Sequence, residues 1–203
     1  YRHMPELVTN GYVYIAQPPL FRIRKNKTEL YLKDEKEFDQ YFVDELVSVS
    51  MLKNLEGKSL KGKDLKNVLQ KVIKLNYLLE SSSKGDNNFY LLLEQATISS
   101  FFDAQNFSDE KKSSQTLDYL LKRLNRIDSG WEASLVDMDF IFSKTKDKIK
   151  EDFVISLNSI NENKYHEFNK ICETIQEYFL SPSKLTLDEN EIEIHTPRDL
   201  VSK

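Results

Sequence analysis

The residue types that most often carry catalysis are scarce and scattered in this chain. It contains three histidines, His3, His166 and His195, and a single cysteine, Cys172. None of the histidines has a cysteine or a carboxylate at the spacing of a metal site. Cys172 falls on the apolar stripe of an expected helix, which indicates a buried structural thiol rather than a nucleophile. The sequence therefore predicts no catalytic residue, no metal ligand and no cofactor ligand.

Asp137 and Asp139 are the pair of carboxylates that comes closest to a Mg²⁺ site. Side chains two residues apart on a strand point to one face, so the two carboxylates could share an ion in a magnesium-dependent phosphodiesterase. However, Met138 alternates with the apolar Val136 and Phe140. This alternation favours a half-buried strand whose solvent face carries both aspartates.

Clustered cations give a better indication of a binding role. The stretch "RIRKNK" contains Arg22, Arg24, Lys25 and Lys27, which we predict to be DNA-binding residues. Cations grouped in this way can neutralise a few phosphates of a nucleic-acid backbone. The alternative is an ordinary solvated face of a hairpin.

A second basic stretch spans residues 53–74, with seven lysines against two acids. We expect four of them on the exposed side of a long helix, available for phosphates or simply solvated: Lys61, Lys63, Lys66 and Lys74. Residues 1–33 carry a net charge of +4 and residues 53–74 carry +5, whereas the whole chain carries −4. The positive charge is therefore concentrated in these two stretches, and the rest of the chain is acidic. This distribution argues against nucleic-acid affinity over the whole surface.

Composition limits the class of protein further. At 203 residues, 39% hydrophobic and 31% charged, the chain has the composition of a solvated globular protein with a real core. We expect no membrane span or signal segment and a cytoplasmic location, which also suits a single cysteine. The chain begins at Tyr1 without a methionine, within the expected last turns of a helix that closes at residues 10–11. This favours a piece of a longer protein.

The elements that position the first basic cluster can be predicted at residue level. A two-residue turn at 26–27 sets Lys25 opposite Thr28, and the pairing then continues to Phe21 opposite Leu32. Arg22 and Arg24 share the polar face of this hairpin. The preceding run 12–16 is expected to be a buried strand that ends at two prolines.

Most of the remaining chain is expected to be helical. Helices are predicted from Asp34, over 65–79 with Asp64 as N-cap, over 89–99, behind Ser113 and Ser114, and over 164–179. A loop is expected over 81–88, and an antiparallel hairpin within 131–157, which turns at "KTKDK". "EIEIH" predicts a short strand, and Thr196 is expected to cap a final helix with Pro197 at its first position.

The opening residues closely resemble a known family. "YRHMPELVTNGYVYIAQPPLFRIRKNKTELYLKDEKE" is similar to the stretch of the DNA gyrase B subunit that closes its metal-binding TOPRIM fold. The resemblance covers residues 1 to about 40, and "GYVYIAQPPL" is its most specific part. "TPRDLVSK" more weakly resembles the helix that returns the family's chain to that fold. Many Gram-negative members carry a large insert between these two points.

The resemblance implies three segments. Residues 1–40 would be the C-terminal piece of the TOPRIM domain, 41–190 the insert domain, and 191–203 the strand and helix that return. The family's catalytic glutamate and metal-ligating aspartates would lie before Tyr1, so no catalytic residue is carried over. The parent implied is an ATP-dependent, Mg²⁺-dependent type II DNA topoisomerase that forms an A₂B₂ heterotetramer with the A subunit.

We therefore expect an α+β fold: a helix-rich insert domain with an antiparallel hairpin, attached to TOPRIM-derived strands and a hairpin. The expected role is a non-catalytic, structural and DNA-supporting part of the B subunit, with weak and salt-dependent affinity for double-stranded DNA. The alternative is a protein-interaction module that contacts the A subunit or other B-subunit domains. A magnesium-dependent phosphodiesterase is a third alternative.

Overall fold

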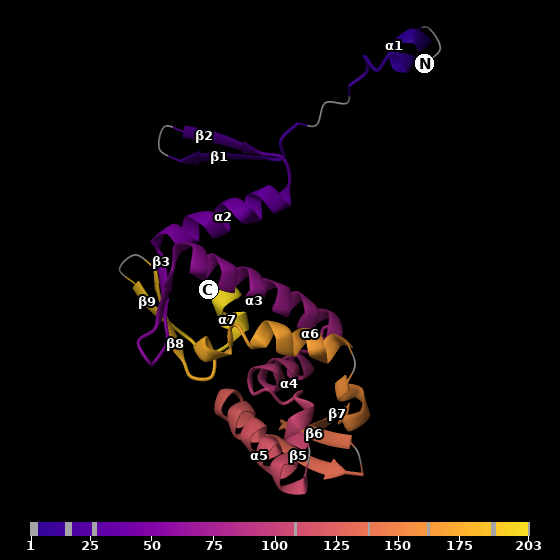
Figure 1. The fold of residues 1–203 in the computed structure, drawn as a ribbon, viewed down its shortest axis with the longest axis vertical. Coiled ribbons are helices and arrows are strands. Elements are labelled where there is room, and N and C mark those ends of the chain that lie inside the picture. The colour runs from indigo at the N-terminus through magenta and orange to yellow at the C-terminus, as the bar shows by residue number, and fades with distance from the viewer. Residues whose placement is uncertain are drawn as a thin grey trace. The chain divides into compact units, whose positions relative to one another are not determined.

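The computed structural model has seven α-helices and three small antiparallel sheets within the residues it describes (Figure 1). Those residues are 4–14, 18–25, 28–107, 109–137, 139–161, 163–187 and 190–202. This mixture confirms the predicted α+β class. Internal contacts divide the chain into two units, Tyr1–Ser48 and Val49–Lys203. No helix in these described stretches has the length and apolar character needed to cross a bilayer.

The first unit contains a two-stranded hairpin followed by a helix. Its elements are α1 (Pro5–Thr9), β1 (Phe21–Lys25), β2 (Thr28–Leu32) and α2 (Glu35–Val49). α2 begins as predicted, because the Asp34 carboxylate accepts the backbone N–H of Glu37 at 2.8 Å. The rings of Phe21 and Phe38 lie 4.5 Å apart, so the apolar face of the hairpin packs on α2.

The strand predicted over residues 12–16 is wrong for the residues that the structure describes there. Tyr12, Val13 and Tyr14 are outside any strand and are 67%, 59% and 85% exposed. A strand needs a neighbour to accept and donate its ladder hydrogen bonds, and no described strand lies beside this run. Residues 15 and 16 lie outside the described residues.

The second unit is built around α3, which contacts three other helices (Figure 1). The helices of this unit are α3 (Gly62–Ser83), α4 (Asn87–Ile98), α5 (Glu110–Ile127), α6 (Asn163–Cys172) and α7 (Pro197–Ser202). Among the helices, α3 makes its main contacts with α4, α6 and α7. Of the six residues that the apolar period places on one face, five are buried and Leu69 is half-buried; the five are Leu65, Val68, Val72, Leu75 and Leu79.

Several predicted helix ends are wrong. α3 starts at Gly62, so Asp64 lies in its first turn rather than at the N-cap. α3 also runs through Ser83, which shortens the expected loop to residues 84–86. α5 is capped by Asp109, whose carboxylate accepts the Lys112 N–H at 2.8 Å. Ser113 and Ser114, which were expected to cap this helix, therefore lie inside it.

The predicted helix 164–179 ends early, at Cys172. The chain continues through i to i−3 hydrogen bonds, such as Ile175 N–H to Cys172 O at 2.9 Å, into the short 3₁₀ helix Gln176–Tyr178. A 3₁₀ turn repeats every three residues, which keeps Ile175 and Tyr178 on the buried side. The apolar spacing therefore suits either conformation.

A four-stranded antiparallel sheet joins segments that are far apart in sequence. Its order is β4 (Ser59–Lys61), β3 (Ser50–Lys53), β8 (Ser183–Leu187) and β9 (Asn190–Ile194). Leu52, Leu185 and Ile194 are buried on its inner face, and β3 and β4 contact α3. Only β9, the "EIEI" strand, was predicted from sequence.

A three-stranded antiparallel sheet forms where the hairpin was expected. Its strands are β5 (Trp131–Val136), β6 (Asp139–Lys146) and β7 (Ile149–Ser156). The turn between β6 and β7 is at Asp147 and Lys148, both with positive φ, as a two-residue hairpin requires. The prediction of one strand through Asp137 is wrong, because Asp137 has a φ of +54° and lies in the turn that joins β5 to β6.

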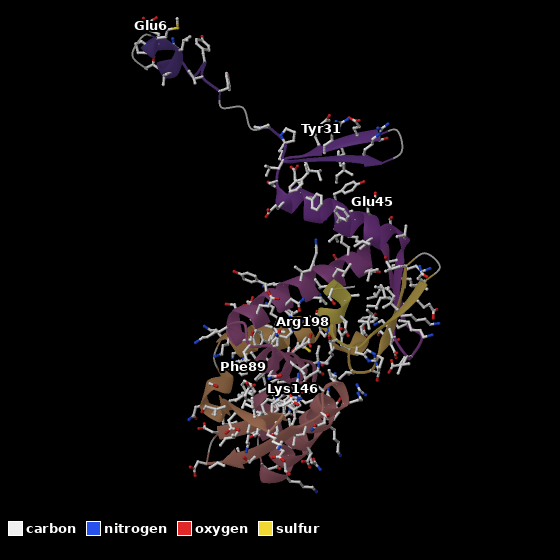
Figure 2. The ribbon with its side chains drawn as sticks, turned by 180° about the vertical axis from the view of Figure 1, so that it is seen from behind. Glu6, Tyr31, Glu45, Phe89, Lys146 and Arg198 are labelled. Atoms are coloured by element: carbon white, nitrogen blue, oxygen red, sulfur yellow. The ribbon has the colours of Figure 1, made fainter. Side chains whose placement is uncertain are left out.

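The core of this unit is aromatic. Phe101 is fully buried, and its ring contacts those of Phe107, Phe140 and Phe142 at 5.0 to 5.8 Å. The Phe89 ring, at the start of α4 in Figure 2, stacks on Phe153 of β7 at 5.5 Å. These contacts attach the three-stranded sheet to the helices.

Candidate functional site

The hairpin β1–β2 has the register that the sequence predicts. Phe21 pairs with Leu32, and the ladder continues to Lys25 opposite Thr28. Arg22 and Arg24 are both exposed, whereas Phe21 and Ile23 are half-buried. Figure 2 shows Tyr31, the partner of Arg22, on the side of the hairpin away from α2. The polar face is thus free of the helix that packs on the hairpin.

The two arginines of this face differ in their surroundings. The Arg22 guanidinium donates to Glu29 Oε1 at 2.5 Å, and this hydrogen bond raises the pKa of Arg22. The Tyr31 hydroxyl donates to the other oxygen of Glu29 at 3.3 Å. Arg24 makes no ion pair or hydrogen bond through its side chain with any residue that the structure describes. Of the two arginines, Arg24 is therefore the more available to an anionic ligand.

The other two predicted DNA-binding residues are Lys25 and Lys27. Lys25 occupies the last position of β1, and its side chain is not described. Lys27 lies outside the described residues. Whether any of these four residues touches DNA remains a prediction.

The lysines of 53–74 do not form a single helical face. Lys61 lies on β4, and Lys63 is in the first turn of α3. Lys74 binds Glu167 of α6 at 2.6 Å, and Lys66 is half-buried. The expected cationic stripe of four lysines is therefore divided between a strand and a helix.

The four-stranded sheet instead gathers lysines on its outer face. Lys53 of β3 lies directly opposite Lys184 of β8, and Lys61 of β4 lies opposite Met51. All three lysines are exposed. This cluster could not be predicted from the sequence without strands β3, β4 and β8, and none of the three was predicted. The period-two pattern of "SKLTL" was the available signal for β8.

A buried carboxylate, Glu94 of α4, forms the other distinctive polar site. It is 1% exposed, and its Oε1 accepts the backbone N–H of Arg198 at 2.9 Å. Burial raises the pKa of Glu94 to about 7, against the opposing effect of the Arg198 hydrogen bond. Arg198, visible on α7 in Figure 2, stacks over the Tyr90 ring at 4.5 Å and donates to Asn87 at 3.2 Å. These contacts fix α7 to α4.

Glu94 also borders an open pocket of about 460 Å³ between α4, α5 and α7. Arg126, His195 and Asp199 are among its lining residues. The Asp199 carboxylate accepts hydrogen bonds from the backbone N–H groups of His195 and Thr196. In return, the Thr196 hydroxyl oxygen accepts the Asp199 N–H at 3.1 Å and so caps α7. The predicted cap at Thr196 is confirmed.

The expectation for Cys172 is also confirmed. It is 2% exposed, and its thiol donates to the Thr97 carbonyl at 3.1 Å. Burial raises the pKa of the thiol to about 12, which leaves it protonated at neutral pH. Cys172 is therefore a structural residue.

The geometry assumed for an aspartate-based metal site is not present. Asp137 lies in a turn and Asp139 on β6, so they are not two residues of one strand. His166 and His195 are exposed, and His3 lies outside the described residues. Within the described parts of the chain, no three His, Cys, Asp or Glu side chains are grouped to hold a metal ion.

Comparison with known proteins relates the whole chain to one kind of subunit. It is 31% identical over 205 residues to the DNA gyrase B subunit of Rickettsia bellii, and 30% identical over 205 residues to the type 2 topoisomerase B subunit of Aquifex aeolicus. Each match covers 100% of this chain and 25% of the relative. The DNA gyrase B subunit of Caulobacter vibrioides is 47% identical over 70 residues, which is 34% of this chain. No family model matches the chain.

Proposed function

We propose, on the premise that this chain is homologous to a segment of about 205 residues of the DNA gyrase B subunit, that it is a structural and DNA-supporting segment of such a protein. In this proposal the parent is an ATP-dependent type II topoisomerase that supercoils DNA. The observation that carries the proposal is the alignment of the entire chain with relatives named for this activity. The chain spans about a quarter of the length of those relatives.

The proposed division of the chain follows its likeness to that family. Residues 1–40 close the TOPRIM domain, 41–190 form the insert, and 191–203 return to the first domain. The exposed apolar side chains of Tyr12, Val13 and Tyr14 support this division. Exposed apolar runs of strand-forming residues usually have a partner surface, which the longer parent would supply.

DNA contact is assigned first to the hairpin. Arg24 is exposed and free of described partners, and Arg22 becomes available if a phosphate displaces Glu29. The A subunit is the proposed protein partner in an A₂B₂ assembly. ATP and Mg²⁺ are proposed to act in other segments of the parent, and this segment is proposed to have no catalytic activity of its own.

Fluorescence anisotropy of a labelled DNA duplex tests this role. At about 50 mM salt the chain should bind the duplex weakly, and Arg24→Glu should reduce the affinity several-fold because one phosphate contact becomes repulsive. Lys146→Glu, which makes the same change of net charge at an exposed position of β6, is the control for a general effect of charge. The absence of binding by the wild-type chain at low salt would overturn the DNA-supporting role.

A protein-interaction module is the second candidate function. Ile73 and Tyr77 lie one turn apart on α3 and are 43% and 73% exposed, an apolar pair on the helix surface. Such a pair suits a contact with the A subunit or with another domain of the parent chain. Loss of affinity for the A subunit in Ile73→Glu and Tyr77→Glu variants that keep full DNA affinity would favour this function.

A further inference from the structure

The outer face of the four-stranded sheet has a one-sided distribution of charge. Along one row, Ser59 lies opposite Lys53, Lys53 opposite Lys184, and Lys184 opposite Glu193. In the next row, Lys61 lies opposite Met51, Met51 opposite Thr186, and Thr186 opposite Glu191. Lysines therefore occupy strands β4, β3 and β8, while the acids of these two rows are on β9.

The pairing of Lys53 with Lys184 is unfavourable for the sheet itself. Residues directly opposite on antiparallel strands have their Cβ atoms about 5 Å apart, and like charges there repel. Lys184 relieves part of this repulsion by binding Glu191 at 2.9 Å, which also raises the pKa of Lys184. Lys53 and Lys61 have no ion pair with any residue in the described part of the chain. An arrangement that costs stability is better explained by a ligand than by the fold.

The neighbouring Lys58 provides a contrast. It lies in the turn between β3 and β4, and its ammonium group binds both carboxylate oxygens of Glu177, at 2.6 and 2.8 Å. This ion pair raises the pKa of Lys58 and attaches the turn to the 3₁₀ helix. Lys58 thus has a structural partner, whereas Lys53 and Lys61 on the outer face have none among the described residues.

We propose that the outer face of β4, β3 and β8 binds the phosphate backbone of duplex DNA through Lys53, Lys61 and Lys184. This inference rests on the proposed function and names the surface of the second unit that performs it. The three lysines extend across three strands spaced about 4.8 Å apart, which presents a strip of positive charge rather than a point. A lysine ammonium binds phosphate without reading base sequence, so the contact is sequence-independent. The acids on β9 limit the strip on one side.

Charge-reversal variants of the full chain test this surface by anisotropy with a labelled duplex. Lys53→Glu combined with Lys61→Glu should lower the affinity about tenfold or more at about 50 mM salt. Lys146→Glu combined with Lys150→Glu is the matched control, because both residues are exposed and belong to the three-stranded sheet. Glu191→Gln should act in the opposite direction and tighten binding, since it releases Lys184.

A stability measurement separates binding from folding. Lys53→Glu should leave the thermal unfolding midpoint unchanged or raise it, because the new carboxylate lies opposite Lys184. Weaker DNA binding without a lower midpoint would therefore support the proposal. Equal affinities for the Lys53/Lys61 variant and the Lys146/Lys150 control would overturn it and leave the DNA-supporting function intact. No binding by the wild-type chain would instead refute the proposed function itself.

Discussion

Replacing Glu94 with glutamine should stabilise the chain at neutral and alkaline pH. The folded-state pKa of Glu94 is about 7, raised from 4.5 mainly by burial. Folding therefore favours the protonated carboxyl, and the stability contributed by this group falls as the pH rises from 4.5 to about 7. At about 1.4 kcal/mol per pKa unit, ionised Glu94 costs about 3 kcal/mol above that window. Glutamine is neutral at every pH and keeps an oxygen that can accept the Arg198 N–H.

Urea unfolding followed by tryptophan fluorescence measures this effect. Trp131 is the only tryptophan of the chain and is 4% exposed, so its emission reports on the unit that contains Glu94. The glutamine variant should gain about 3 kcal/mol in unfolding free energy at about pH 8 and almost nothing near pH 4.5. Glu132→Gln, at an exposed position, is the control and should show no such pH dependence. If the glutamine variant and the wild type had the same unfolding free energy at about pH 8, burial of the ionised Glu94 carboxylate would not carry the assigned cost.

Three further substitutions probe the hairpin, the aromatic core and the turn at Gly130. Glu29→Gln should tighten duplex binding roughly threefold in an anisotropy titration, because it releases Arg22; an unchanged affinity would count against the hairpin as a DNA contact. Phe101→Ala should cost about 3 to 5 kcal/mol in urea unfolding, because it empties the centre of an aromatic cluster, and a loss below about 1 kcal/mol would contradict that packing. Gly130→Ala should cost about 2 kcal/mol or more by the same measurement, because Gly130 has a φ of +101° and a Cβ there would lie 2.6 Å from the Thr145 carbonyl oxygen; full stability would show that this turn can relax.

Local patterns in the sequence were sufficient for the elements whose contacts are local. The hairpin register from Phe21 to Leu32 follows from a two-residue turn and side-chain pairing. The buried face of α3 follows from the 3.6-residue period of its leucines and valines. The cap at Thr196 follows from the residue types around Pro197. Each of these depends on residues that are close together in the sequence.

The features that the sequence did not predict have a common physical cause: each depends on contacts between residues that are far apart in the sequence. β3 pairs with β8, which lies more than 100 residues later in the chain. A strand as short as Ser50–Lys53 has no local signal strong enough to predict it. The grouping of lysines on the outer face was not predicted for this reason, since only the pairing brings Lys53 beside Lys184. The burial of Glu94 could be suspected from its apolar neighbours, but the hydrogen bond from Arg198 depends on how α7 packs.

The salt dependence of duplex binding by the full chain shows whether its cations contact DNA phosphates. If phosphate contacts by a few lysines and arginines supply the affinity, a plot of log affinity against log salt between about 50 and 200 mM should have a slope of about −2 to −4. We expect this slope for the wild-type chain and a shallower slope after Lys53→Glu and Lys61→Glu. A slope near zero, or no binding at the lowest salt, would contradict a DNA-supporting role for this chain.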